Sequence, residues 1–213
     1  VSGMLAVGEF YRLHLAQAPW PWWSWLGVAA TGLLLSSAQW PMLVADRTVL
    51  LGTLGIALCL PLLSAKPLRD SLTDGMVLVM GVLYVGLTLS ALLSTRALPD
   101  GALLIFFVVL VTGAADTGAY VAGKSLGRHP LAPVVSPKKT YEGLLGGLLL
   151  ACLAAVVARA WFLPGFSLVD CLALGVILTL TGLIGDLAES AMKRSTGVKD
   201  SGALIPGHGG MLD

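Results

Sequence analysis

Charged side chains are scarce in this sequence: they make up 12% of its 213 residues, against roughly 25% in an ordinary soluble domain. Hydrophobic residues reach 56%. So little charge excludes an ordinary soluble globular protein, whose surface carries most of its many charged side chains. The net charge of +1 points to no class of charged macromolecule, and we expect no nucleic-acid partner. The composition predicts an integral membrane protein.

Cysteine is also rare, and the usual signs of a complete secreted chain are missing. Cys59, Cys152 and Cys171 all fall in apolar runs at spacings unlike a metal knuckle, so we interpret them as small core residues without chemistry. The sequence opens on Val1 without a signal-peptide pattern and closes on Asp213 without an apolar segment. We therefore expect a fragment, with spans missing at both ends, that forms a single transmembrane domain over residues 1–213.

Long apolar stretches are plentiful, and each is long enough to cross a bilayer, which takes about 20 residues. They lack the alternating pattern of barrel strands, and only helices or closed barrels satisfy every backbone group in lipid. We therefore predict an all-α, polytopic protein with about six transmembrane helices. The six segments are about Trp22 to Ala38, Thr48 to Ala65, Gly75 to Leu93, Ala102 to Ala122, Gly143 to Leu163 and Leu168 to Ala188.

Basic residues are distributed unevenly between the two sides that these six segments define. One side holds Arg47, Arg96 and Arg159, and the other holds the ten remaining lysines and arginines. Because cytoplasmic loops are enriched in Lys and Arg, we predict that the ten-residue side faces the cytoplasm. The polar loop before the fifth span and the polar end of the chain then lie on the same, cytoplasmic face, where they can meet at one functional site.

Two segments near the start of the chain have an interfacial composition. The stretch "PWPWWSW" holds four of the six tryptophans, whose rings favour the headgroup level, so it is interpreted as an anchor and not as a ligand cage. Before it, "MLAVGEFYRLHLAQA" mixes apolar and aromatic residues with Glu9 and Arg12, as an interfacial helix does. We expect no catalytic role for this helix.

Carboxylates occur inside two of the predicted spans, although one at the centre of a span costs roughly 2.5 to 3.5 kcal/mol on insertion scales. Asp116 lies near the cytoplasmic end of the fourth span. In the sixth span Asp186, Glu189 and Lys193 are spaced to share one helical face. For Glu189, an ordinary ion pair with Lys193 at i, i+4 explains the pattern equally well. For Asp186 we favour a functional role, because Gly182 and Gly185 precede it and leave room beside the backbone for a ligand or an ion.

The end of the chain offers groups that bind phosphate. Lys193, Arg194 and Lys199 supply cations, and "GHGG", which includes Gly209 and Gly210, supplies backbone N–H groups. The loop before the fifth span adds Lys138 and Lys139. Since Mg²⁺ is usually held by one or two carboxylates and substrate phosphates, these residues predict phosphoryl-type chemistry with Mg²⁺ held by Asp186 and Asp213. A helix cap is the alternative role for Asp213.

Two blocks of sequence then resemble a known family. The run "SAMKRSTGVKDSGALIPGHGGMLD" closely resembles the signature of phosphatidate cytidylyltransferases, or CDP-diacylglycerol synthases, and "DTGAYVAGKSLGRHPLAPVVSPKKTYEG" is similar to the other polar region of that family. Together with the connecting spans the two blocks cover about half of the chain. The family signature usually continues past the last aspartate, whereas this sequence stops at Asp213.

The resemblance implies a nucleotidyltransferase of phospholipid biosynthesis, in which CTP and phosphatidic acid give CDP-diacylglycerol and pyrophosphate at the surface of membrane lipids. It implies that Asp186 and Asp213 bind Mg²⁺, with Asp116 and Glu189 close by. It also implies that a set of cationic and glycine residues binds phosphates. These residues are Lys138, Lys139, Lys193, Arg194, Lys199, His208, Gly209 and Gly210.

Several alternatives stay open at this point. His208 either donates to a phosphate oxygen, which we favour, or shapes the turn, and Asp200 positions either Lys199 or His208. A CTP-dependent polyprenol or phytol kinase and an ion-coupled transporter also fit part of the pattern. The sequence is compatible with a homo-oligomer but does not fix the oligomeric state.

Overall fold

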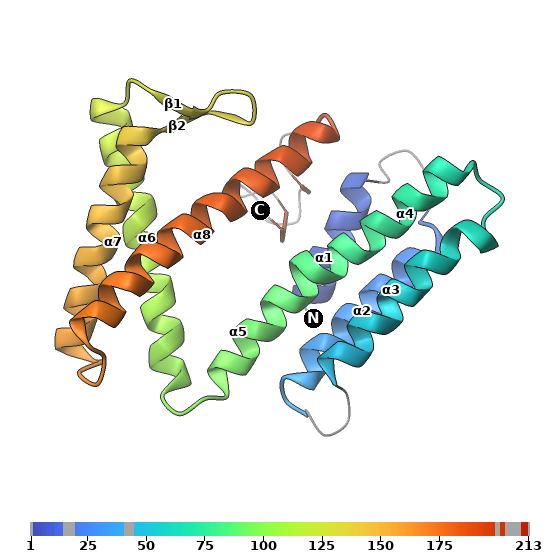
Figure 1. The fold of residues 1–213 in the computed structure, drawn as a ribbon, viewed down its shortest axis with the longest axis horizontal. Helices are drawn as coiled ribbons and strands as arrows, with labels where there is room; N and C mark the ends of the chain where they lie inside the picture. Colours follow the sequence, from blue (N-terminus) through green and yellow to red (C-terminus); the bar gives the residue numbers. More distant parts are fainter. Residues whose placement is uncertain (1, 15–19, 41–44, 199–200, 203–209, 213) are drawn as a thin grey trace. The chain divides into compact units, whose positions relative to one another are not determined.

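The computed structural model describes residues 2–14, 20–40, 45–198, 201–202 and 210–212 (Figure 1). These residues are almost entirely helical, which confirms the predicted all-α class. The chain divides into two compact units. The first comprises Val1–Leu98 with Thr196–Asp213, and the second comprises Pro99–Ser195. That residues 1–213 act as one domain stays a prediction.

In the described part of the chain, five helices are long and apolar enough to cross a membrane. They are α3 (Asp46–Leu63), the continuous helix Leu68–Arg96, α6 (Gly101–Leu126), α7 (Tyr141–Trp161) and α8 (Leu168–Ser195). The helix Leu68–Arg96 comprises α4 (Leu68–Gly81), the π-helical turns η1 (Val82–Leu87) and α5 (Thr88–Arg96). The predicted first span is a helix too, α2 (Trp22–Ser37), but it has only 16 residues. At 1.5 Å per residue it is about 24 Å long, short of the roughly 30 Å hydrocarbon layer.

The first helix, α1 (Ser2–His14), is buried within the first unit. Phe10 and Tyr11 are at most 1% exposed, so α1 is not the surface helix that its mixed composition suggested. The Tyr11 hydroxyl donates to the Leu78 carbonyl of α4 at 3.1 Å. Burial raises the pKa of the Tyr11 phenol, which keeps this donor protonated. A side chain at Gly27 or Gly81 would collide with the Tyr11 ring, so these glycines let two helices close around it.

The tryptophans of "PWPWWSW" divide into two roles. Trp22 and Trp25 are more than half exposed on α2, as expected of interfacial anchors. Trp23 is buried instead and donates its indole N–H to Asp74 of α4 at 3.2 Å. One indole of the segment therefore holds helices of the first unit together.

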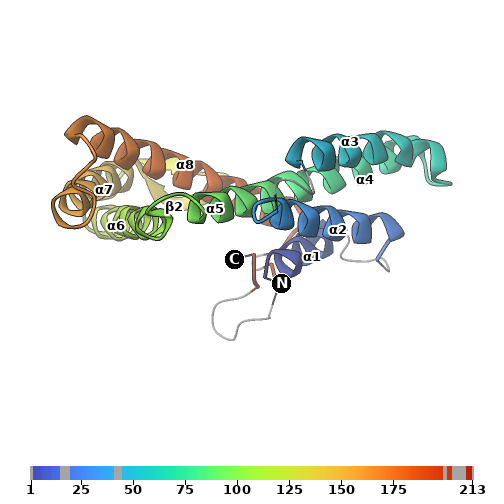
Figure 2. The same ribbon diagram turned by 90° about the horizontal axis from the view of Figure 1, so that it is seen from below.

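In the second unit, α6 and α7 lie side by side along most of their length (Figures 1 and 2). Small residues permit this approach: a Cβ at Gly118 of α6 would meet the backbone of Gly146 and the side chain of Leu150 on α7. Helices in membranes associate largely through such small-residue contacts, because lipid supplies no hydrophobic drive. The buried stripe of α7 consists of Gly143, Gly147, Ala151, Ala155 and Ala158.

The core of the second unit lies toward the start of α6 and the end of α7, and it includes one of the cysteines. Phe107 and Val111 of α6 pack with Ala155 and with Cys171 of α8, which is fully buried. The core role predicted for Cys171 is confirmed. Cys59 is exposed on α3, so a core role was wrong there: an apolar residue of a spanning helix can equally face lipid.

A short β-hairpin interrupts the helices between α6 and α7, and the sequence analysis did not foresee it. Strands β1 (Pro130–Ala132) and β2 (Ser136–Thr140) pair antiparallel, with Pro130 opposite Thr140. Thr140 ends β2 and caps α7, because its hydroxyl accepts from the Gly143 backbone N–H at 3.1 Å. The hairpin is therefore joined to α7 without a flexible linker.

Candidate functional site

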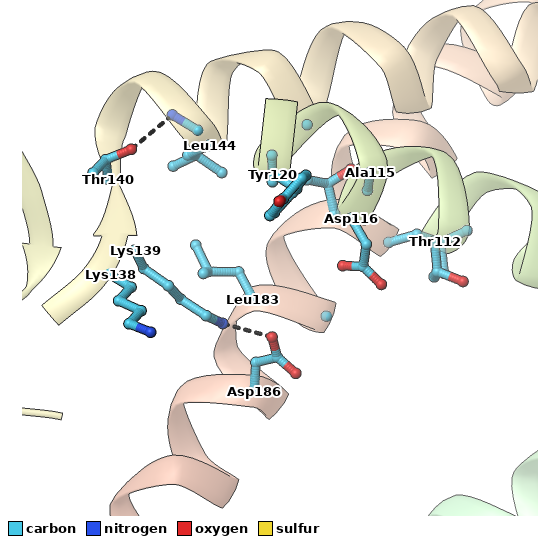
Figure 3. A pocket seen from close by; sticks show the side chains of 16 residues that line it. Thr112, Ala115, Asp116, Tyr120, Lys138, Lys139, Thr140, Leu144, Leu183 and Asp186 are labelled. Atoms are coloured by element: carbon cyan, nitrogen blue, oxygen red, sulfur yellow. Dashed lines mark hydrogen bonds and ion pairs between the residues drawn. The ribbon is translucent and has the colours of Figure 1, made fainter. Parts of the chain in front are cut away.

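A cavity of about 330 Å³ lies in the second unit, lined by α6, β2, α7 and α8. Its lining combines the carboxylates of Asp116 and Asp186 with the ammonium groups of Lys138 and Lys139 (Figure 3). Leu144, Leu178 and Leu183 line the same cavity. The structure thus brings together four of the residues that the sequence analysis predicted for the site, from three separate segments of the chain.

Two of the charged groups that line this cavity are directly paired. Lys139 on β2 donates to the Asp186 carboxylate on α8, with 2.6 Å between Nζ and Oδ2 (Figure 3). The Asp186 side chain stays 61% exposed and that of Lys139 25%. A pair this open to water contributes little to stability. Its consequence is positional, because it holds a cation and a carboxylate where a charged ligand can reach both.

Asp116 supplies a second carboxylate from α6. It is close enough to Asp186 and Lys139 for electrostatic interaction with both. Figure 3 shows the Asp116 and Asp186 carboxylates on two facing helices that border one cavity. Only one of the two carboxylates is paired with Lys139, so carboxylate oxygens remain that can accept from or bind a cation.

Space around Asp186 is provided by glycines, as the sequence analysis expected. Gly182 lines the cavity one turn before Asp186, and a Cβ at Gly182 or Gly185 would meet nothing within 4 Å. Helix packing therefore does not require glycine at either position. It leaves the backbone near Asp186 accessible to a ligand.

Glu142, in the first turn of α7, is a positioning residue that the sequence analysis missed. Its Oε2 accepts from the backbone N–H groups of Arg128 and His129 at 3.1 and 3.3 Å, and its Oε1 lies 2.6 Å from His129 Nδ1. Glu142 thus ties the start of the hairpin to the helix that follows it. The signal was present in the quoted "KTYEG", where a carboxylate follows the lysine pair, but its partners lie 13 and 14 residues earlier.

Glu189 and Lys193 form the ion pair that was the structural alternative for them, with 2.7 Å between Nζ and Oε1. Both side chains are less than one-fifth exposed. Neither they nor Arg194 line the cavity. The metal-binding role of Glu189 and the phosphate-binding roles of Lys193 and Arg194 stay predictions.

The remaining predicted residues belong to the end of the chain, which is part of the first unit. Gly210 is buried there. Lys199, Asp200, His208, Gly209 and Asp213 lie outside the described residues. Their predicted roles in binding phosphate and metal stay predictions.

Comparison with known proteins decides the family. The sequence model described as "Cytidylyltransferase family" matches residues 1–213. The chain belongs to the cytidylyltransferase family. This confirms the resemblance seen in its two polar blocks.

Three relatives of this cytidylyltransferase, all named phosphatidate cytidylyltransferase, illustrate the similarity. The protein of Staphylococcus saprophyticus is 42% identical over 145 residues, that of Staphylococcus haemolyticus 41% over 145 residues, and that of Staphylococcus aureus strain COL 44% over 147 residues. Each match covers 68% of this chain and 55% of the relative. The chain therefore spans little more than half the length of the curated relatives it matches.

The carboxylates of the cavity are suitable ligands for a hard divalent cation such as Mg²⁺. Asp116 and Asp186 are oxygen ligands on one cavity, and Mg²⁺ is commonly held by one or two carboxylates while substrate phosphates and water complete its shell. Among the described residues, no group of three or more His, Cys, Asp or Glu side chains lies close enough to hold a metal. The cavity thus fits Mg²⁺ carried by a phosphate substrate better than a metal caged by protein ligands alone.

Proposed function

We propose that this chain is the membrane-embedded catalytic part of an enzyme that transfers a cytidylyl group from CTP to phosphatidic acid, giving CDP-diacylglycerol and pyrophosphate. The observation that carries the proposal is the mixed lining of one cavity, where paired carboxylates and lysines lie beside leucines on helices of spanning length. Membership of the cytidylyltransferase family and relatives named for this activity support it.

The reaction needs little help in activating its nucleophile. A phosphate monoester has a second pKa of about 6, so phosphatidate is largely dianionic at neutral pH. One of its oxygens attacks the α-phosphorus of CTP, a P–O bond forms, and the bond from the α-phosphorus to the α,β-bridging oxygen breaks. The electron pair leaves with pyrophosphate. The main barrier is the approach of two polyanions, so the site must supply positive charge.

The lysines of β2 are placed to supply that charge. Lys138 and Lys139 lie side by side in the chain and both line the cavity. When a phosphate oxygen accepts from Lys139, the Asp186 carboxylate is released from its ion pair and becomes available to a cation that accompanies the nucleotide. Because Thr140 and Glu142 fix the hairpin to α7, the lysines need little reordering on binding.

In this proposal Asp186 and Asp116 would hold Mg²⁺ together with substrate phosphates, and Asp213 and Glu189 stay predicted further ligands. When bound, Mg²⁺ would neutralise charge on the triphosphate and on the leaving pyrophosphate. The chain's own part is to present two exposed carboxylates to the cavity. Asp186 stays 61% exposed although it is paired with Lys139, and Asp116 is exposed as well. The prediction of Mg²⁺ dependence rests on this oxygen-rich donor set.

The leucines of the cavity suit a lipid substrate. Leu178 and Leu183 on α8 and Leu144 on α7 border the space next to the charged groups. The acyl chains of phosphatidate must stay in the hydrocarbon layer while CTP arrives from water. A cavity with polar and apolar walls between spanning helices satisfies both requirements.

Orientation follows from the charges of the connecting loops. The hairpin loop between α6 and α7 carries Lys138, Lys139 and Arg128, whereas Arg159 is the single Lys or Arg of the segment that ends α7 and leads into α8. By the positive-inside rule the hairpin side faces the cytoplasm. We therefore propose an inner-membrane enzyme whose cavity opens toward cytosolic CTP.

Product analysis tests the proposed reaction. We expect the full-length protein, in vesicles that contain phosphatidate, to incorporate label from α-³²P CTP into lipid and to release an equal amount of pyrophosphate. A CTP-dependent lipid kinase would instead transfer label from γ-³²P CTP and release CDP. Ion flux in vesicles without any CTP turnover would indicate a transporter. Either of these two outcomes would refute cytidylyl transfer.

A further inference from the structure

A carboxylate that the proposed chemistry does not use is buried in the first unit. Glu9, in the middle of α1, is 8% exposed. Among the described residues, no lysine or arginine forms an ion pair with it. A buried charge is costly unless hydrogen bonds satisfy it, so the groups that surround Glu9 indicate its role.

Those groups come from the opposite end of the chain. Glu9 Oε2 accepts from the Leu212 backbone N–H at 2.9 Å and from the Ser201 hydroxyl at 3.5 Å. The two contacts span 203 and 192 residues of sequence. Both views show the described pieces 201–202 and 210–212 beside α1 (Figures 1 and 2). A charge-assisted bond from a backbone N–H is among the stronger hydrogen bonds in proteins.

Two glycines bring this segment close to Glu9. A Cβ at Gly202 would lie 3.0 Å from Glu9 Oε1, and a Cβ at Gly210 would collide with Glu9 Oε2 and with Ser201 Oγ. Neither glycine needs a positive φ. Their lack of a side chain is therefore explained by the carboxylate itself, around which the two ends of the glycine-rich segment close.

We propose that Glu9 is a positioning residue that holds residues 201–202 and 210–212 together, directly before the predicted metal ligand Asp213 in the sequence. The inference rests on the proposed function and on the prediction that Asp213 binds the metal carried with CTP. In this proposal Glu9 does not touch substrate. It acts through the Leu212 amide, so its loss frees residues 210–212 rather than removing a reacting group.

Hydrogen–deuterium exchange of the full-length protein tests the contact without relying on activity. In Glu9→Ala the Leu212 amide loses its acceptor, and we expect a peptide covering residues 210–212 to exchange at least about tenfold faster than in the wild type. Glu9→Gln keeps an acceptor oxygen of the same reach and should show a much smaller increase. Tyr11→Phe is the matched control, because it removes one buried hydrogen bond of the same helix, to Leu78, and should leave this peptide unchanged.

Kinetics then distinguish positioning from mere support of the fold. We expect Glu9→Ala to lower kcat about 10- to 100-fold with less than about threefold change in KM for CTP, Glu9→Gln to recover most of kcat, and Tyr11→Phe to keep it. Unchanged exchange in Glu9→Ala would overturn the contact, and faster exchange with an unchanged kcat would overturn its role in the reaction. If the wild type made no CDP-diacylglycerol, the proposed function would fail while exchange still decided the contact.

Discussion

Asp186→Asn is expected to lower the rate of CDP-diacylglycerol formation by about 100- to 1,000-fold. The substitution keeps the size of the side chain but removes the carboxylate that faces the cavity from α8. Removal of one preorganised electrostatic group from an active site typically costs this much. Because Asp186 is 61% exposed, its loss should leave the fold intact. The measurement is incorporation of labelled cytidine into lipid at saturating CTP and phosphatidate.

Asp170→Asn is the matched control for this change. Asp170 lies in the first turn of the same helix, α8, and its carboxylate accepts from the Ser167 hydroxyl at 2.7 Å, away from the cavity. The same change of charge there should leave the rate within about twofold, since only a helix cap is weakened. Near-wild-type activity of Asp186→Asn would show that Asp186 is not needed for the reaction, and it would refute the proposed cation site.

Lys139→Ala is expected to lower kcat/KM for CTP by about 100-fold or more. The Lys139 ammonium lies 2.6 Å from the Asp186 carboxylate, measured from Nζ to Oδ2. In the proposed reaction it donates to a CTP phosphate oxygen instead. A hydrogen bond to a charged group is worth about 1.5 to 3 kcal/mol, and one that joins a charged donor to a charged acceptor is among the strongest in proteins. Steady-state kinetics over a range of CTP concentrations measure the effect.

The double variant shows whether Lys139 serves the substrate or only Asp186. If Lys139 binds phosphate, Lys139→Ala with Asp186→Asn should be slower than either single variant. If it only holds Asp186, the double variant should be no worse than Asp186→Asn, and the phosphate role is wrong. Arg128→Ala is the control, because it removes an exposed cation of the same loop that does not line the cavity; it should change kcat/KM less than about threefold.

The spanning helices could be predicted from the sequence because hydropathy and length alone set them. The limits of this signal appear at Trp22–Ser37, which hydropathy predicted as a span although its helix has only 16 residues. Hydropathy also could not tell Cys171, in the core, from Cys59, exposed on α3. Both residues lie in apolar runs, and only packing decides which face of a helix meets protein and which faces lipid.

The candidate site was predicted where charge stood out against an apolar background. Asp116 and Asp186 were visible because carboxylates are costly in a span, and Lys138 and Lys139 because cations in a polar loop can bind phosphate. The Lys139–Asp186 pair joins residues 47 positions apart, so no local pattern could pair them. The β-hairpin was missed because its strands have three and five residues, too few for a periodic signal.

For Glu9, by contrast, the local sequence pattern suggested the wrong environment. In "AVGEFYRL" a single carboxylate among apolar residues reads as the polar side of an interfacial helix. Its partners, Ser201 and Leu212, are about 200 residues away, far beyond the i, i+4 range in which side-chain pairs can be read from sequence. Only the fold brings them together.

Protection of the cavity by CTP tests directly whether the nucleotide binds there. Ala119 lines the cavity on α6, and Ser125, further along the same helix, does not. In full-length protein free of other cysteines, Ala119→Cys should react with a membrane-impermeant maleimide added from the cytosolic side, and CTP with Mg²⁺ should slow that reaction about tenfold or more. Ser125→Cys should react equally with and without CTP. Unchanged labelling of Ala119→Cys at saturating CTP would show that CTP does not bind in this cavity, and labelling from the outer side alone would contradict its cytoplasmic orientation.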